Sequence, residues 1–294
     1  MEKQSTTDTR VRCRPIGDAD LEAVADLLAR GFAPRPRAYF LDGLRRQAGR
    51  AVPDGLPRYG YLLETGGVPV GAVLLIFTGR SGEAGPRCNI ASWYVDPPYR
   101  GHAAMLSSMA LRNKQATYLN VTPAPSTWPI LEAQGYRRYC SGLFAAFPLL
   151  SLIGAGRRVE TVAPGTTAVA GLDEAEARLL GDHAGYGCLS LVVRGPDGPS
   201  PFVFLPFRMR SGRIPLPVMQ LAYCRSVEDF VAAAAPLGRA LALRGRFAVL
   251  IDAVGPVPGL AGIYTERRGR KYVKGPGEAR LADLTDTELV IFGP

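Results

Sequence analysis

One stretch of the sequence, Ser92–Leu106, combines residue types that could bind a phosphate group. It reads SWYVDPPYRGHAAML, so an apolar strand ends in Asp-Pro-Pro and passes through an arginine-glycine turn into a helix. The first amides of a helix have no partner within it, the helix dipole is positive at that end, and small residues let a pyrophosphate approach the backbone. Arg100 can add a charge-assisted hydrogen bond. The stretch therefore predicts an anion site, with a plain strand-to-helix turn as the alternative.

Hydrophobic periodicity and turn residues predict the elements that position this stretch. An apolar hairpin precedes it, and a strand and a short helix follow it. The predicted elements are a strand at Val11–Ile16, a helix from Asp18 to Gly31, a short helix at Ala38–Gln47, a hairpin of Tyr59–Glu64 and Pro69–Thr78, a strand at Cys88–Val95, a helix at His102–Lys114, a strand at Ala116–Thr122, a helix at Ser126–Gln134 and an extended run at Tyr136–Phe147. This order is typical of an α/β fold.

With this element order, the turn resembles the signature of the GNAT superfamily of acyl-CoA N-acyltransferases, which is Val-x-Pro-x-x-Arg-Gly-x-Gly-x-Gly/Ala after the fourth strand. Four residues match the signature: Val95, Pro97, Arg100 and Gly101. Ala103 and Met105 stand where the family has glycine and glycine or alanine. The resemblance implies an acyl-CoA donor, acetyl-CoA by default. The binding residues that it implies are Trp93, Tyr94, Val95, Arg100, Gly101, His102, Ala103, Ala104 and Met105.

The resemblance leaves the catalytic groups open. Many members of the family take a base from a glutamate on the fourth strand and an acid from a tyrosine on the helix after the fifth. No carboxylate lies on the predicted fourth strand here, and Leu131 stands where that tyrosine would be. Strand alternation places Ser92 and Tyr94 on one face, opposite Ala91 and Trp93. Ser92 and Tyr94 are therefore the catalytic candidates, able to hold a water on the substrate side, with packing roles as the alternative for both.

The second half of the chain repeats the strand-helix-strand pattern at Pro217–Ala253, which tandem duplication would explain. We expect an α/β (α+β) chain of two GNAT-like domains, residues 1–150 with the acyl-CoA site and a degenerate domain at residues 151–294. Each would be a mixed, mostly antiparallel sheet flanked by helices.

In the second half, the loop that corresponds to the Arg100 turn is Cys224–Asp229. It has no glycine and places two carboxylates at a helix start that Ser226 caps. They would repel a pyrophosphate, so this domain is predicted to bind no coenzyme A in that way.

Composition and charge narrow the function classes. With 294 residues, 47% hydrophobic and 21% charged, the sequence predicts a folded globular chain, and its longest apolar run, Leu143–Gly154, is too short for a bilayer and contains a proline. The polar start of the chain has no secretory signal, so we expect a cytoplasmic protein. Five cysteines without a CxxC motif and two histidines without neighbouring ligands predict neither a disulfide framework nor a metal site.

The sequence thus favours an acyl-CoA-dependent N-acyltransferase that acts on an amine of an unknown acceptor. The net charge of +9 suits the phosphates of coenzyme A. The alternative is a catalytically inactive GNAT-like protein that binds acyl-CoA or a protein partner, which the missing glutamate and tyrosine favour. Nucleic-acid binding ranks last, because it rests on charge alone.

Overall fold

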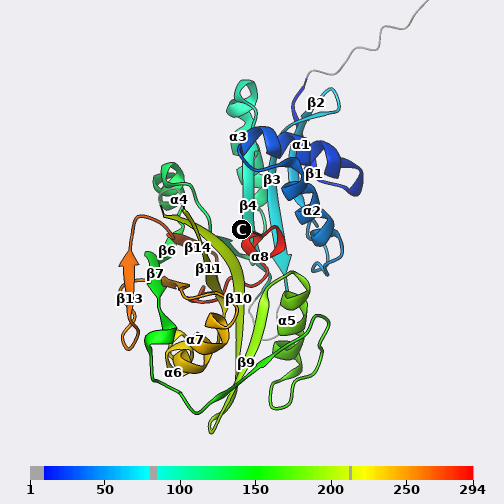
Figure 1. The fold of residues 1–294 in the computed structure, drawn as a ribbon. Coiled ribbons are helices and arrows are strands. Elements are labelled where there is room, and N and C mark those ends of the chain that lie inside the picture. Colours follow the sequence, from blue (N-terminus) through cyan, green and yellow to red (C-terminus); the bar gives the residue numbers. More distant parts are fainter. Residues whose placement is uncertain (1–9, 80–84, 212–213, 294) are drawn as a thin grey trace, which may run out of the picture. The chain divides into compact units, whose positions relative to one another are not determined.

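The structure of the protein is a computed structural model that describes residues 10–79, 85–211 and 214–293. Two seven-stranded, mostly antiparallel sheets flanked by helices build the fold (Figure 1), which confirms the predicted class. The chain divides into two compact units: unit 1 consists of Met1–Asn120 with Val273–Glu278, and unit 2 of Val121–Tyr272 with Ala279–Pro294. These units have other bounds than the expected domains, residues 1–150 and 151–294, whose duplication stays a prediction.

The described residues of the first segment of unit 1 form both strands and helices. The strands are β1 (Arg12–Pro15), β2 (Gly60–Thr65), β3 (Val68–Thr78), β4 (Arg87–Val95) and β5 (Thr117–Asn120), and the helices are α1 (Leu21–Gly31), α2 (Arg37–Ala48) and α3 (Ala103–Ala110). β1 to β4 pair with their neighbours in antiparallel order, whereas β5 is parallel to β4. The predicted hairpin and the strand after it are therefore confirmed as β2, β3 and β4.

Alternation along β3 divides the core of unit 1 between its two faces. Leu75 and Phe77 point to the side of α3, where they line a pocket together with Met109. Leu74 and Ile76 point to the opposite side, and α1 packs against β3 there. Thus α1 and α3 cover opposite faces of the sheet. The segment that joins β4 to α3 leads from the sheet to the helix on one face, and Arg100, Gly101 and His102 in it are exposed.

Unit 2 contains the second sheet. The strands of that sheet are β7 (Gly142–Ala146), β8 (Arg158–Thr161), β9 (Leu189–Gly195), β10 (Gly198–Ser211), β11 (Ile214–Tyr223), β12 (Val249–Ala253) and β13 (Gly262–Thr265). Unit 2 also contains β6 (Arg137–Cys140), which belongs to the first sheet, and the helices α4 (Trp128–Ala133), α5 (Glu174–Gly185), α6 (Val227–Ala232), α7 (Ala234–Ala242) and α8 (Glu288–Ile291). β14 (Lys271–Lys274) begins in unit 2 and ends in unit 1. The strand orders are β1-β2-β3-β4-β5-β14-β6 in the first sheet and β13-β7-β12-β11-β10-β9-β8 in the second.

The predicted strand-helix-strand repeat is confirmed in unit 2. β11 and β12 form a parallel pair, as β4 and β5 do, and α6 and α7 connect them. Ser226 caps α6, since its Oγ accepts a hydrogen bond of 3.1 Å from the Asp229 amide. The two halves of the chain therefore share the same local connection around a parallel strand pair.

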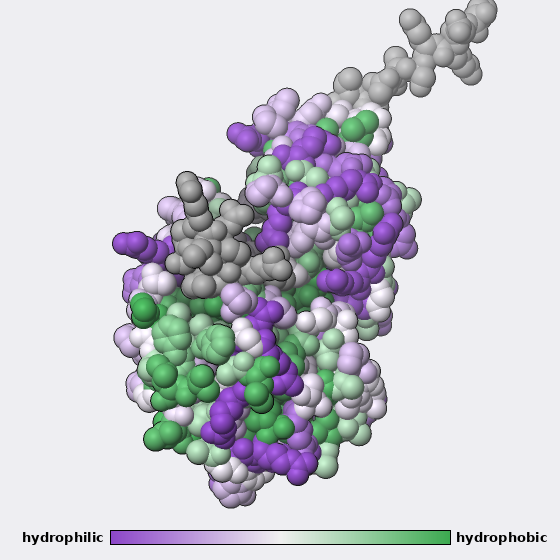
Figure 2. Space-filling view, viewed as in Figure 1, coloured by the Kyte–Doolittle hydropathy of each residue, from purple (hydrophilic) through white to green (hydrophobic). Residues whose placement is uncertain are grey.

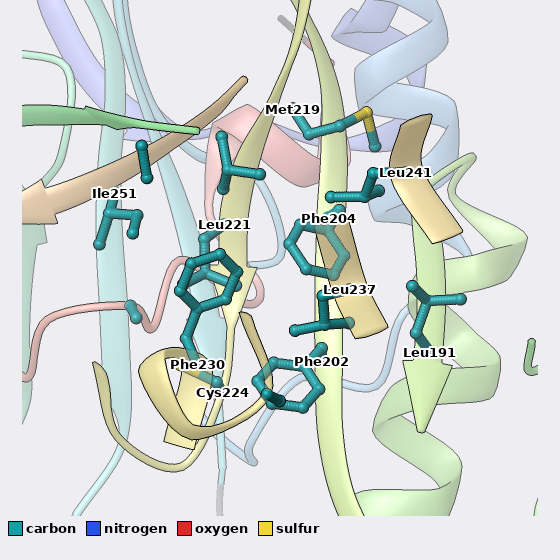
Figure 3. Close-up of a cluster of buried hydrophobic side chains, with 14 of the residues drawn as sticks. Leu191, Phe202, Phe204, Met219, Leu221, Cys224, Phe230, Leu237, Leu241 and Ile251 are labelled. Atoms are coloured by element: carbon teal, nitrogen blue, oxygen red, sulfur yellow. The ribbon is translucent and has the colours of Figure 1, made fainter. Parts of the chain in front are cut away.

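Aromatic and aliphatic side chains form the core of unit 2 (Figure 3). The ring of Phe230 on α6 lies 6.4 Å from that of Phe202 and 6.2 Å from that of Phe204, both on β10. Leu221 of β11 and Ile251 of β12 are fully buried in the same cluster. Burial of these side chains holds α6 and α7 against one face of the sheet. On the side drawn in Figure 2, apolar residues gather over β7, α6 and α7, and hydrophilic residues over α1 and α2.

Candidate functional site

The candidate site in unit 1 begins where β4 and β5 separate. The register pairs Arg87–Asn89 of β4 with Thr117–Leu119 of β5, and β5 ends one residue later. The buried Asn89 holds this point, because its side-chain amide donates to the carbonyl oxygens of Leu119 and Ile90, both at 3.2 Å. Beyond it, Ile90–Val95 runs on without β5 beside it. This edge of β4 can therefore offer backbone donors and acceptors to an extended ligand.

A β-bulge interrupts β4 beside this edge. Ala91 pairs with Leu74 and Tyr94 with Ala72, so two residues of β4 lie opposite the single residue between them on β3. Ser92 occupies the bulge with φ of 44°, a left-handed conformation that is uncommon for residues other than glycine. The expectation that alternation places Ser92 and Tyr94 on one face, opposite Ala91, is wrong, because the extra residue brings Ala91 and Tyr94 to the same face and interrupts the alternation at Ser92.

The strained backbone of Ser92 leads to a testable prediction. Ser92→Gly is expected to raise the free energy of unfolding by up to about 1 kcal/mol, because glycine adopts positive φ without a Cβ clash. Ser92→Val is expected to lower it by about 1–2 kcal/mol. Urea denaturation measures both changes. The same glycine substitution at Ser108, exposed on α3, should lower stability by about 0.5 kcal/mol, and a similar loss at Ser92 would show that the bulge carries no strain.

Tyr94 packs against the end of α1. A Cβ added at Gly31 would lie 2.3 Å from the Tyr94 ring, so only glycine fits there. The Tyr94 hydroxyl donates to the Asp96 carboxylate, which also accepts a hydrogen bond of 3.1 Å from Arg30. Burial, followed by the bond to Asp96, raises the pKa of Tyr94. At neutral pH this phenol therefore keeps its proton and can act as a donor, whereas it cannot act as a base.

Sequence reasoning missed Arg30 and Asp96 as members of this site. Asp96 was read as the residue that ends the strand, and Arg30 as part of the last turn of a helix. The two residues are 66 positions apart in the chain, so only the packing of α1 on β4 brings their side chains together. The spacing of Tyr94 and Asp96 in the sequence could have predicted half of this arrangement, because strand alternation places residues two apart on one face.

The other β4 candidates differ in exposure. Trp93 is 39% exposed at the edge of the sheet and is accessible to a ligand. Ser92 is half-buried. Val95 is buried, and its Cγ2 would lie 3.1 Å from a Cβ at Gly71 on β3, so its side chain belongs to the core. The backbone of Val95, not its side chain, is therefore the part that a ligand can reach.

The turn after β4 is wound as a 3₁₀ helix over Pro97–His102, and α3 begins at Ala103. Pro97 and Pro98 have no amide hydrogen, and the Tyr99 amide donates to the Asp96 carbonyl at 2.9 Å. The Ala103 amide donates to the Arg100 carbonyl. The predicted cradle of unpartnered amides at the helix start is thus reduced, because the helical segment starts earlier than expected and begins with two prolines.

The side chains of the turn nonetheless remain accessible. Arg100, Gly101 and His102 are exposed, and a Cβ at Gly101 would meet nothing within 4 Å. Ala103 is half-buried, and Ala104 and Met105 are exposed. Arg100 and Arg30 both act on the Tyr94 phenol, whose pKa they lower against the larger effect of burial. The turn therefore offers positive charge and small residues to an anion, with fewer backbone donors than an open glycine loop.

Other chemistries have less support in the described residues. The thiols of Cys88 and Cys140 are buried, and burial raises the pKa of Cys140 to about 11 and that of Cys88 well above its usual range. Both stay protonated at neutral pH, which disfavours a thiol nucleophile. Among the residues that the structure describes, no three or more His, Cys, Asp or Glu side chains form a group that could hold a metal ion. In the same ranges, every helix is too short or too polar to span a membrane.

Comparison with known proteins adds information on the fold. No protein-family model matches the sequence, and no curated protein matches it. A GCN5-related N-acetyltransferase from Anabaena variabilis matches with a TM-score of 0.56 and 15% identity, over 90% of this chain and 72% of that chain. Another from Kribbella flavida matches with a TM-score of 0.56 and 16% identity, over 92% of this chain and 72% of that chain. The chain therefore has the fold of the GCN5-related N-acetyltransferases, as the motif in its first half predicted.

Proposed function

We propose, from this fold, that the protein transfers an acetyl or other acyl group from acyl-CoA to an amine. The observation that carries the proposal is the edge of β4 beyond Asn89, which is free of β5 and leads directly into the exposed Arg100 turn. The structural neighbours named as acetyltransferases support the same reading.

The donor would lie along β4 and the turn that follows it. Backbone groups of Trp93, Tyr94 and Val95 would pair with the amide groups of the pantetheine arm. Arg100 and His102 would contact the phosphates, where a guanidinium forms charge-assisted hydrogen bonds. The small and exposed surface of the start of α3 completes the contact. The residues of this surface are Gly101, Ala103, Ala104 and Met105.

The chemistry assigns different tasks to the two catalytic candidates. The amine nitrogen bonds to the thioester carbonyl carbon, the carbon–sulfur bond breaks, the amine loses a proton and the leaving thiolate gains one. Tyr94 keeps its phenolic proton and can supply it to the thiolate. Ser92 lies two residues away in the bulge, where its hydroxyl can hold a water that takes the proton from the amine. Asp96 and Arg30 orient the phenol.

Calorimetric titration tests the donor site. Acetyl-CoA, coenzyme A and a long-chain acyl-CoA are titrated into the wild type, Arg100→Glu and Arg46→Glu, the last a charge reversal at an exposed arginine on α2. Loss of a charge-assisted bond to a phosphate weakens binding by about 10- to 100-fold, and charge repulsion adds to this in Arg100→Glu. Arg46→Glu should bind like the wild type. If the wild type binds none of these compounds at millimolar concentration, acyl transfer is ruled out.

A second function, acyl-CoA binding without turnover, is favoured by two observations. The Arg100 turn begins with two prolines and is wound as a 3₁₀ helix. The buried Leu131 of α4 stands where many members of the family have a tyrosine that acts as the general acid. Release of free thiol from acetyl-CoA in the presence of a panel of amines separates the two functions. An enzyme releases coenzyme A with at least one amine, whereas a binding protein takes up the donor and releases none.

A further inference from the structure

A pocket of about 270 Å³ in unit 1 lies between the end of α3 and the sheet. Tyr61 of β2 faces it from the same side of the sheet as Leu75, because Tyr61 pairs with Val73, two residues before Leu75 on β3. Tyr118 of β5 and residues 55–57 also line it. A cavity of about 150 Å³ can hold benzene, so this pocket has room for one substituted ring.

This pocket is separate from the proposed donor site. The donor residues lie on β4, on the Arg100 turn and at the start of α3, whereas the pocket is lined by residues at and just beyond the end of this helix, Met109, Ala110, Arg112 and Asn113. An α-helix rises by about 1.5 Å per residue, so the two ends of α3 are about 12 Å apart. Among the described residues, none of those assigned to the donor lines the pocket. A ligand here would therefore bind in addition to acyl-CoA.

The hydroxyl of Tyr61 is a polar group that the fold leaves open in this pocket. The residue is 4% exposed, and its hydroxyl has no hydrogen-bond partner among the described residues, although its oxygen is not closed off from solvent. Two neighbouring buried tyrosines do have partners. Tyr59 donates to Asp18 Oδ1 at 2.5 Å, and Tyr118 donates to the Asn113 carbonyl at 3.0 Å. Since buried polar groups are normally hydrogen-bonded, the Tyr61 hydroxyl can donate to a ligand in the pocket.

The charge at the pocket is positive. Among the described residues that line it, the exposed Arg112 is the only charged one, and its guanidinium has no ion-pair or hydrogen-bond partner in the described part of the chain. Lys114 Nζ donates to the Leu111 carbonyl at 3.3 Å, where it offsets the negative end of the α3 dipole. Burial raises the pKa of Tyr118, so this phenol stays uncharged at neutral pH. The pocket therefore favours an anion over a cation.

The apolar walls of the pocket suit an aromatic ring. The rings of Phe77 and Tyr118 lie edge to face, with 6.5 Å between their centroids. Met109 of α3 and Leu75 of β3 line the same space. Edge-to-face contacts between rings and contacts between a thioether sulfur and a ring are both favourable. An aromatic body would therefore gain more here than an aliphatic one of equal size.

We propose that this pocket of unit 1 binds a small aromatic carboxylate. The Tyr61 hydroxyl donates a hydrogen bond to an oxygen of this ligand, Arg112 pairs with its carboxylate, and its ring packs against Phe77 and Met109. Acyl-CoA takes no part in this binding, and the residues of the two sites differ. Failure of the acyl-CoA titration would therefore leave this proposal intact.

Three probes of similar shape test the charge preference: para-hydroxybenzoate, para-hydroxybenzyl alcohol and para-hydroxybenzylammonium, titrated by NMR without acyl-CoA. A ligand of about ten non-hydrogen atoms can reach a Kd in the millimolar range. The carboxylate is expected to saturate there and to bind at least about tenfold more tightly than the other two, since a hydrogen bond between charged groups is worth that factor. Equal binding of the ammonium, or no saturation by the carboxylate, would overturn the proposal.

Two variants locate the ligand. Tyr61→Phe removes only a hydroxyl without a partner among the described residues, so the fold should be retained and para-hydroxybenzoate should bind at least about fivefold more weakly. Arg112→Gln changes an exposed side chain and is expected to weaken para-hydroxybenzoate at least about tenfold, while the affinity for the neutral alcohol stays within about twofold. Tyr264→Phe is the matched control, because its hydroxyl belongs to unit 2 and lies outside the pocket lining, so its affinity should stay within about twofold of the wild type. Unchanged binding of the carboxylate to either pocket variant would place it elsewhere and refute the proposal.

Discussion

Replacing Lys271 with methionine is expected to lower the free energy of unfolding by about 3–5 kcal/mol. Lys271 Nζ lies 3.0 Å from Asp252 Oδ1, and the two side chains are 4% and 1% exposed. Without the ammonium group, Asp252 keeps only the Gln220 amide at 3.4 Å. A buried carboxylate without a counter-charge is strongly disfavoured, because no opposite charge offsets the free-energy cost of removing it from water. Urea denaturation at neutral pH measures the loss.

A double variant separates loss of charge balance from loss of packing. Asp252→Asn combined with Lys271→Met removes both charges and is expected to recover most of the stability, since a buried pair can often be replaced by neutral groups. Burial already raises the pKa of Asp252 against the effect of Lys271. The deficit of Lys271→Met should therefore shrink as the pH falls and Asp252 becomes protonated. A loss below about 1 kcal/mol in the single variant would mean that water reaches the carboxylate.

Glu288→Gln is expected to stabilise the protein at pH 8 by up to about 3 kcal/mol and to change little near pH 4. Burial raises the pKa of Glu288 to about 7, although Thr122 Oγ1 donates to its Oε1 at 2.5 Å. An unfolded glutamate titrates near pH 4.3. The folded state thus binds this proton more tightly, so the contribution of Glu288 to stability is present below about pH 4 and is lost as the pH rises through 7.

The difference between the wild type and Glu288→Gln isolates this group from all others that titrate. Urea denaturation of both proteins between pH 4 and 8 should give curves that separate as the pH rises. Glutamine keeps an oxygen that can accept the hydrogen bond from Thr122. Glu278→Gln is the control, because Glu278 is exposed and such a change usually moves stability by less than about 0.5 kcal/mol. Parallel curves for Glu288→Gln would show that the carboxylate is solvated.

Much of the fold could be predicted from local sequence signals. The hairpin of β2 and β3 follows from two apolar runs around Thr65-Gly66-Gly67, and the strand β4 from the apolar run that Asp-Pro-Pro stops. The cap of α6 follows from Ser226 and Asp229, because a capping hydrogen bond joins residues three apart. These features depend on neighbours in the chain, which is why residue type and spacing determine them.

The candidate site could be predicted only in part. The Arg100 turn was located from its motif and is exposed at the end of β4. The bulge at Ser92 was missed, because alternation assumes one residue opposite each partner and the bulge arises from pairing with β3. The 3₁₀ start of the helical segment was missed as well. It follows from Pro97 and Pro98, which suit the first turn of a helix but have no backbone N–H group to donate.

The sequence by itself determined the succession of strand, helix and strand in each half of the chain and the place of the Arg100 turn, since both depend on residues close together in the chain. Only the tertiary structure decided which distant groups meet. Arg30 reaches Asp96, Lys271 reaches Asp252 and Thr122 reaches Glu288 through the packing of separate elements. Burial raises the pKa of both Glu288 and Asp252, because the cost of a charge depends on how much water surrounds it.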